Sequence, residues 1–216
     1  MNDVMITSLR SYWERLRAGR IAPYRAEIDP REFESALENM FIIERIAPGN
    51  FRIRLAGLKI CEIAGMEVRG MEPSHLIAEP DQARFERLLG VVMTEPAVVE
   101  LGLETEPRPV ISRATMLLMP LRSDFGEINR VLGCASLDGT FYPPPVAFLI
   151  KDISISPVQV ATPEASNRSQ ALPGFAEDVL GFEAPESAPR LRAIEGNPDA
   201  APDKRSRPKL RVVDND

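Results

Sequence analysis

The amino-acid sequence predicts an α+β fold with five antiparallel strands and short helices on one face of the sheet. Two segments with strand-like alternation come first, a series of short helical segments follows, and three more strand-like segments come last. Because short turns join consecutive strands in the last group, those strands must run antiparallel. The apolar face of such a sheet needs a cover, and the helical segments between the strands provide it.

The first two strands form a predicted hairpin within "FIIERIAPGNFRIRLAG". Two short β-favouring runs flank Pro48, Gly49 and Asn50, which are typical turn residues. In the second run, Phe51, Ile53 and Leu55 alternate with arginines. This alternation predicts a strand with one buried face.

The helical segments follow the hairpin. Glycines at 57, 65 and 70 and prolines at 73 and 80 divide this stretch into short pieces, and only the piece from Pro80 is long enough for a full helix. Its apolar stripe consists of Phe85, Leu88, Leu89 and Val92. We expect this stripe to face the sheet.

The last three strands are predicted around Val99–Leu103, "SRATMLLMPL" and "RVLGCASLDG". Apolar side chains from sheet and helices then meet in one layer, where they either interdigitate fully or leave a cavity for a small apolar or amphipathic ligand. The filled core is the favoured interpretation. The residues that would line a cavity are Ile53, Leu55, Ile60, Cys61, Phe85, Leu101, Met116, Leu118 and Cys134.

Two helices are predicted before the sheet. In the first, Leu9, Trp13 and Leu16 fall on one apolar stripe. The second starts at "DPREFESALENM", with Asp29 as its cap and Glu32 at the capping-box position. The outer sheet face needs a cover, so we expect a homodimer formed through the stripe of the first helix. The alternative is a monomer in which the helix packs on its own sheet.

The predicted organisation has three parts: N-terminal helices (1–40), a sheet-bearing domain (41–142) and a Pro-rich flexible tail (143–216). More than half of the 20 prolines lie in the tail, which has few apolar residues to bury. Two patches stand apart in it, "VAFLIKDISI" from Val146 and the terminal "KLRVVDND". Either patch could dock as a strand on a neighbouring edge, or form a local strand without function.

Charge and composition exclude several classes of function. A formal net charge of −6 disfavours nucleic acids and anionic membrane surfaces as partners. No apolar run approaches the length of a membrane span, and the first residues do not resemble a secretory signal. Cys61 and Cys134 both lie in apolar surroundings, which suits free thiols in a reducing compartment. We therefore expect a cytoplasmic protein.

The sequence lacks the common motifs of catalysis. The single histidine, His75, is followed by no zinc-binding Glu-x-x-His pattern, and there is no Gly-x-Ser-x-Gly elbow or Gly-rich phosphate loop. We therefore expect neither an enzyme nor a metal site, and we assign no catalytic residue.

The order of elements and several motifs resemble the PAS domain. In "CEIAGMEVRGMEPSHLIAEPDQARFERLL", an acidic, apolar helical turn leads to a glycine, a loop and a Pro-Asp pair, Pro80 and Asp81, which opens the long helix. The run "SYWERLRAGRIAPYRAEIDP" is similar to the N-terminal segment of small, chiefly alphaproteobacterial, stand-alone PAS proteins. The resemblance covers roughly Leu9 to Gly139.

The resemblance implies a sensory or protein-interaction module, in which cofactors must be weighed one by one. Haem in related sensors needs an axial histidine on the long helix, whereas His75 precedes that helix. Flavin photochemistry needs a cysteine in an Asn-Cys-Arg-Phe type of motif, which neither Cys61 nor Cys134 has. We therefore expect no cofactor.

Two functions remain open. The first is a non-enzymatic signalling module that acts through contacts with a signalling protein, which the sequence does not name. The alternative is a sensor that binds a small apolar or amphipathic metabolite between sheet and helices.

Overall fold

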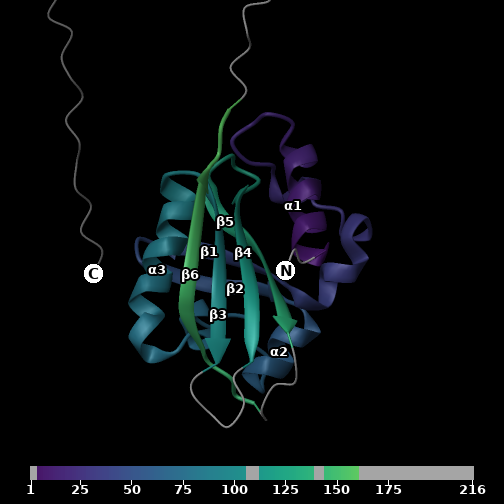
Figure 1. Ribbon diagram of the computed structural model, residues 1–216. Coiled ribbons are helices and arrows are strands. Elements are labelled where there is room, and N and C mark those ends of the chain that lie inside the picture. Colours follow the sequence, from purple (N-terminus) through teal and green to yellow (C-terminus); the bar gives the residue numbers. More distant parts are fainter. Residues whose placement is uncertain (1–3, 106–111, 139–143, 161–216) are drawn as a thin grey trace, which may run out of the picture. The chain divides into compact units, whose positions relative to one another are not determined.

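The structure, a computed structural model, describes residues 4–105, 112–138 and 144–160 (Figure 1). Its centre is a six-stranded sheet with the order β2-β1-β5-β4-β3-β6. All neighbouring strands are antiparallel. The strands are β1 (Met40–Ala47), β2 (Asn50–Ala56), β3 (Ala97–Thr105), β4 (Arg113–Arg122), β5 (Ile128–Asp138) and β6 (Phe148–Pro157).

The predicted antiparallel α+β architecture is confirmed, but the prediction of five strands is wrong. The sixth strand, β6, lies in the Pro-rich tail, within and just beyond the patch "VAFLIKDISI" that could dock as a strand on a neighbouring edge, and it pairs with β3 from Ala97 to Thr105. Val146, Phe148 and Ile150 of this segment are buried, so it contributes to the apolar core despite its Pro-rich surroundings. The sheet-bearing unit therefore extends beyond residue 142. The remainder of the predicted tail, including "KLRVVDND", lies outside the described residues.

Helices cover both faces of the sheet: the short helices lie on one face, as predicted, and the N-terminal helices lie on the other. The inner face, as we call it, carries α2 (Leu58–Ala64), the 3-10 turn η3 (Pro73–Leu76) and α3 (Glu79–Thr94). The outer face carries α1 (Val4–Arg17), η1 (Arg25–Glu27) and η2 (Pro30–Asn39). Figure 1 shows α3 and α1 on opposite sides of the strands.

Each face has its own apolar core, because side chains alternate along every strand. The predicted stripe of α3 is buried against the inner face, with Phe85 and Leu89 fully enclosed. The outer face presents Ile42, Leu117 and Leu132 to α1 and η2. Apolar side chains and helices cover both faces of the sheet. This explains why β4 is buried from Met116 to Leu121 without interruption.

The predicted interface residues of α1 pack on the protein's own sheet. Leu9 and Trp13 have no exposed surface, and Leu16 is partly buried beside them. The Trp13 indole donates a hydrogen bond of 3.0 Å from Nε1 to the Pro120 carbonyl oxygen of β4. Within one chain, the helix thus covers the outer face that the predicted homodimer would have buried. The homodimer itself stays a prediction.

The second N-terminal helix differs from its prediction. It is a 3-10 helix interrupted at Phe33, whose φ of −145° is not helical. The interruption accompanies burial of the Phe33 ring, whose centroid lies 5.0 Å from that of Tyr12. Asp29 caps the helix by accepting a hydrogen bond from the Arg31 amide, as predicted. Glu32, predicted to complete a capping box, instead pairs with Arg15 of α1 at 3.3 Å.

Candidate ligand-binding pocket

Most of the predicted cavity residues lie in the inner core. Six of them are buried there within one continuous cluster, and Cys61 packs at its border. These side chains contact one another across the layer between the sheet and α2 and α3. The six are Ile53, Ile60, Phe85, Leu101, Met116 and Leu118.

Leu55 and Cys134 lie elsewhere, and the prediction of a cavity position for them is corrected. Cys134 belongs to the outer core, because it pairs with Met40 on the face that η2 and α1 cover. Leu55 is 40% exposed. Ile42 pairs with Leu55 but Ile43 pairs with Ile53, so Arg54 is an extra residue in β2, a β-bulge. The bulge breaks the alternation and turns Leu55 to the outer face.

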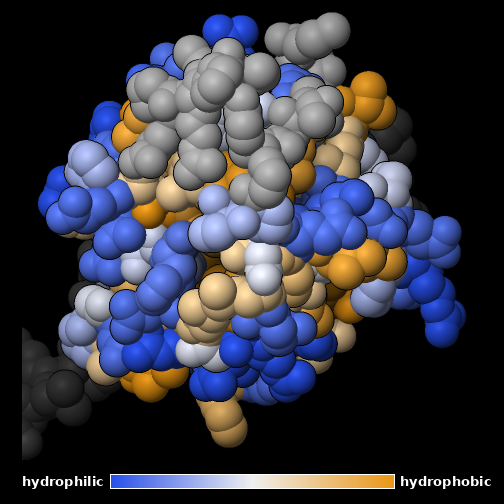
Figure 2. Space-filling view, turned by 90° about the horizontal axis from the view of Figure 1, so that it is seen from below, coloured by the Kyte–Doolittle hydropathy of each residue, from blue (hydrophilic) through white to orange (hydrophobic). Residues whose placement is uncertain are grey.

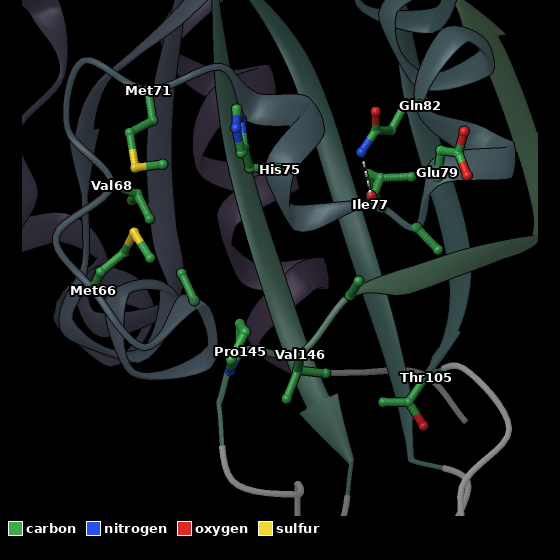
Figure 3. A pocket seen from close by; sticks show the side chains of 13 residues that line it. Met66, Val68, Met71, His75, Ile77, Glu79, Gln82, Thr105, Pro145 and Val146 are labelled. Atoms are coloured by element: carbon green, nitrogen blue, oxygen red, sulfur yellow. Dashed lines mark hydrogen bonds between the residues drawn. The ribbon is translucent and has the colours of Figure 1, made fainter.

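A pocket of about 450 Å³ opens at the edge of the inner core (Figure 3). This volume lies within the range of sites for small molecules. Its apolar wall contains Met66, Val68 and Met71 from the segment after α2, together with Ile77. At the end of the domain where α2 lies, hydrophobic residues reach the surface between hydrophilic ones (Figure 2).

Backbone hydrogen bonds hold the segment that closes the pocket on one side. Val146 donates to the Ile63 carbonyl of α2 at 2.9 Å, and Phe148 accepts from the Ala78 amide at 2.8 Å. The Ile150 amide donates to Asp81 Oδ2 of α3 at 2.8 Å. Hydrogen bonds therefore anchor the segment 145–147 to α2 at one end and to the start of α3 at the other. This segment continues directly into β6.

The polar groups of the pocket are mainly hydrogen-bond acceptors. His75 Nδ1 lies 3.0 Å from the Glu72 carbonyl oxygen, so Nδ1 donates to this carbonyl, and in the corresponding neutral tautomer Nε2 is an acceptor. Gln82 donates through Nε2 to the Ile77 carbonyl at 3.1 Å, as Figure 3 shows, which leaves its Oε1 to accept. Glu79, an acidic residue at the start of α3, is also among the lining residues. A ligand that satisfies these groups must donate hydrogen bonds.

Sequence reasoning missed these lining residues, because they come from a stretch that Gly and Pro divide into short pieces. One signal was present: "GMEVRGMEP" places two methionines around a valine outside any regular element. Methionine side chains adapt to irregular apolar surfaces and are frequent at sites that bind varied ligands. The position of His75 beside them depends on η3, which the sequence does not specify.

On the outer face, Glu44 of β1 pairs with two arginines. Glu44 Oε1 accepts from Nε and Nη2 of Arg130 at 3.2 and 3.1 Å, and Oε2 accepts from Arg54 Nε. Burial acts to raise the pKa of Glu44, but hydrogen bonds and charges from the two arginines outweigh it. The pKa of Glu44 is therefore lower than its usual value.

We expect Glu44→Gln to destabilise the protein at neutral pH, and the loss to shrink on acidification. A carboxyl whose pKa is lowered by folding adds stability above its unfolded pKa, near 4.5, and that stability disappears as the pH falls through the folded pKa. Urea denaturation of both proteins at a series of pH values measures the difference. Glu34→Gln, which removes an exposed carboxylate from η2, is the control. A pH-independent difference for Glu44→Gln would contradict the expectation.

Other site types find no support among the described residues. No three His, Cys, Asp or Glu side chains gather there in a way that could hold a metal ion. No helix in the same part of the chain has the length and apolar character to cross a membrane. Cys61 and Cys134 are both free thiols.

The sequence profile of the PAS domain family matches residues 1–136. This match spans more than half of the chain and includes α1 and both faces of the sheet up to β5. The chain therefore belongs to the PAS domain family, as its motifs and order of elements predicted. The strand β6 and the segment 144–147 beside the pocket lie beyond the matched region.

Comparison with solved structures finds light-oxygen-voltage (LOV) proteins. The light-state LOV domain of the blue-light photoreceptor Aureochrome1 is 16% identical to this protein, with a TM-score of 0.36. The match covers 49% of this chain and 85% of the LOV chain. A Rhodobacter sphaeroides LOV protein is 14% identical, with coverages of 52% and 69% and a TM-score of 0.36. An RNA-binding LOV receptor is 17% identical, with coverages of 52% and 34% and a TM-score of 0.38. The TM-scores are low, and the membership in the PAS domain family rests on the sequence profile alone. Comparison with curated proteins finds no significant match.

Proposed function

We propose that this PAS domain is a non-enzymatic sensory module whose pocket binds a small amphipathic molecule and whose output is a change in protein contacts. The observation that carries the proposal is the pocket of about 450 Å³ with an apolar wall and free acceptors at its rim. The acceptor atoms, His75 Nε2 and Gln82 Oε1, favour a ligand whose polar end is an alcohol or an amine. The Glu79 carboxylate favours the amine further.

The hydrogen bonds that anchor residues 145–147 and the start of β6 support the second part of the proposal, the change in protein contacts. The closing segment of the pocket continues directly into β6, and β6 pairs with the whole of β3. A ligand that binds one arrangement of this segment better than another shifts the equilibrium between them. Such a shift changes the outer edge of the sheet and the position where the chain leaves it. A partner protein that contacts this edge then responds to the ligand.

Three probes with the same eight-carbon chain test the proposed polarity: octylamine, octan-1-ol and octanoate. We expect octylamine to bind most tightly and octanoate least, with about a tenfold difference between the two charged probes. Isothermal titration calorimetry measures the affinities, and native mass spectrometry of the freshly purified protein detects a retained ligand. Equal affinities for amine and carboxylate would refute the acceptor-lined site.

A matched pair of variants tests the position of the site. Ala147 lines the pocket and is only partly buried, so Ala147→Trp fills the pocket from its rim without entering the core. We expect this change to abolish octylamine binding. Ala47→Trp adds the same side chain at the exposed end of β1 and is expected to leave binding unchanged. If no probe binds and the purified protein carries no ligand, a module that acts by protein contact alone remains.

A further inference from the structure

A second hollow lies on the outer face of the sheet, where β1, β2 and β5 are neighbours. Its volume is about 610 Å³, and four arginines line it together with two glutamates. The arginines come from four separate segments: Arg25 from η1, Arg54 from β2, Arg69 from the segment after α2, and Arg130 from β5. The whole chain carries a net charge of −6, so this concentration of guanidinium groups runs against the overall charge.

Arg54 faces this hollow because it follows the inward-facing Ile53 in the alternation of β2, and the β-bulge at Arg54 turns the next side chain, Leu55, to the same side. Arg54 is the unpaired extra residue between the Ile42 and Ile43 pairs, and its guanidinium reaches Glu44 on the neighbouring strand. Bulges recur next to functional sites because they redirect a side chain that regular alternation would send elsewhere. Leu55 thereby lines the hollow, where it forms an apolar wall with its cross-strand neighbour Ile42.

Glu44 orients two of the arginines without exhausting their donors. Arg130 uses Nε and Nη2 on Glu44, and Arg54 uses Nε, so each retains further N–H groups. The second acid, Glu67, accepts a hydrogen bond from the Arg69 backbone amide at 3.0 Å and lies 3.8 Å from Cys61 Sγ. Within the described part of the chain, the side chains of Arg25 and Arg69 form no ion pair.

We propose that this hollow binds a phosphorylated small molecule, with its phosphate on the arginines and its organic part against Leu55 and Ile42. A phosphate monoester carries close to two negative charges and several acceptor oxygens, so it can accept from guanidinium groups that approach from different directions. The volume exceeds that of a bare phosphate, and the apolar wall gives the remainder of the ligand a contact surface. The site lies on the opposite face of the sheet from the first pocket and is independent of the proposed function.

Phenyl phosphate is the probe, because it joins a phosphate to a small apolar group. We expect it to bind more tightly than inorganic phosphate, which lacks the apolar group, and more tightly than benzoate, which has a single charge and two acceptor oxygens. The binding should weaken with added salt. Isothermal titration calorimetry at low ionic strength measures the affinities. Undetectable binding of phenyl phosphate at millimolar concentrations, or equal binding of benzoate, would overturn the proposal.

Variants that leave the ion pairs intact locate the site. The double change Arg25→Gln and Arg69→Gln removes two exposed, unpaired guanidinium groups and should weaken phenyl phosphate binding by about tenfold or more. Arg87→Gln removes an exposed arginine from α3 on the other side of the sheet and should have no effect. A double variant that binds as well as the unchanged protein, or an equal loss in Arg87→Gln, would overturn the assignment.

A change of opposite sign completes the test. Glu44→Gln removes a negative charge from the hollow and releases donors of Arg54 and Arg130, so phenyl phosphate should bind several-fold more tightly to this variant than to the unchanged protein. Circular dichroism verifies that the variant is folded, and unchanged or weaker binding by the folded variant would contradict the proposed role of these arginines. A phosphoserine peptide that displaces phenyl phosphate at much lower concentration would instead assign the hollow to a protein partner and overturn the small-molecule proposal.

Discussion

Trp13→Ala is expected to lower the free energy of unfolding by about 3–5 kcal/mol, because it leaves a large cavity between α1 and the outer face of the sheet. Trp13 has no exposed surface, and its indole satisfies the Pro120 carbonyl at 3.0 Å. The substitution leaves that carbonyl without its side-chain partner as well. Because Trp13 is the only tryptophan, urea denaturation must be followed by far-UV circular dichroism rather than by tryptophan fluorescence.

The control for this change is Val4→Ala on the same helix. Val4 is 82% exposed, and its substitution should alter stability by no more than about 0.5 kcal/mol. A loss below about 1 kcal/mol for Trp13→Ala would show that α1 does not pack on the sheet in solution. The same experiment bears on the predicted homodimer. If α1 is exchanged between two copies, the unfolding midpoint of the unchanged protein rises with protein concentration.

Gly133→Ala is expected to destabilise the protein by about 1–3 kcal/mol or more, through overpacking. Gly133 of β5 lies opposite Phe41 of β1, and the Phe41 ring occupies the space where a Cβ would stand, with Cδ2 only 2.7 Å from that position. Phe41 is itself buried in the inner core, so the ring cannot move without displacing its neighbours. Urea denaturation compares the variant with the unchanged protein.

Two further variants separate a steric clash from a general effect of replacing glycine. Phe41→Leu in the Gly133→Ala background should recover part of the lost stability, giving a favourable coupling energy in a double-mutant cycle. Gly90→Ala in α3 has the opposite expected sign, because nothing lies within 4 Å of the added Cβ and alanine favours a helix by about 0.5–1 kcal/mol. An equal loss at Gly90 and Gly133 would contradict the steric explanation.

The sequence predicted the strands and helices best where the apolar period is regular. The hairpin around Gly49 and the stripe of α3 follow directly from alternation and from helical spacing, and both are found in the structure. The strand β6 was predicted only as one of two possibilities, because composition over a long window hides a ten-residue strand of which nine residues pair with β3. The partner of β6 is distant in the sequence, so no local window of residues can reveal this pairing.

The pocket was predictable only in its general place. Spacing showed which residues face the layer between sheet and helices, but six of these fill that layer with their own side chains. The open space lies at its edge, where Met66, His75 and Val146 come together from three separate segments. Leu55 shows a second limit. A single extra residue in β2 reverses its side, and no local pattern around Arg54 announces the bulge.

The pairing of β6 with β3 bears on how the C-terminal residues can be studied by truncation. Removing everything after residue 142 would strip the edge strand and leave the N–H and C=O groups of β3 free to recruit strands from other molecules. Aggregation of such a shortened protein would then result from the exposed edge of the sheet, and it would reveal nothing about the role of the removed residues. A cut placed after residue 160 keeps β6 in place, so any change it causes belongs to the deleted segment.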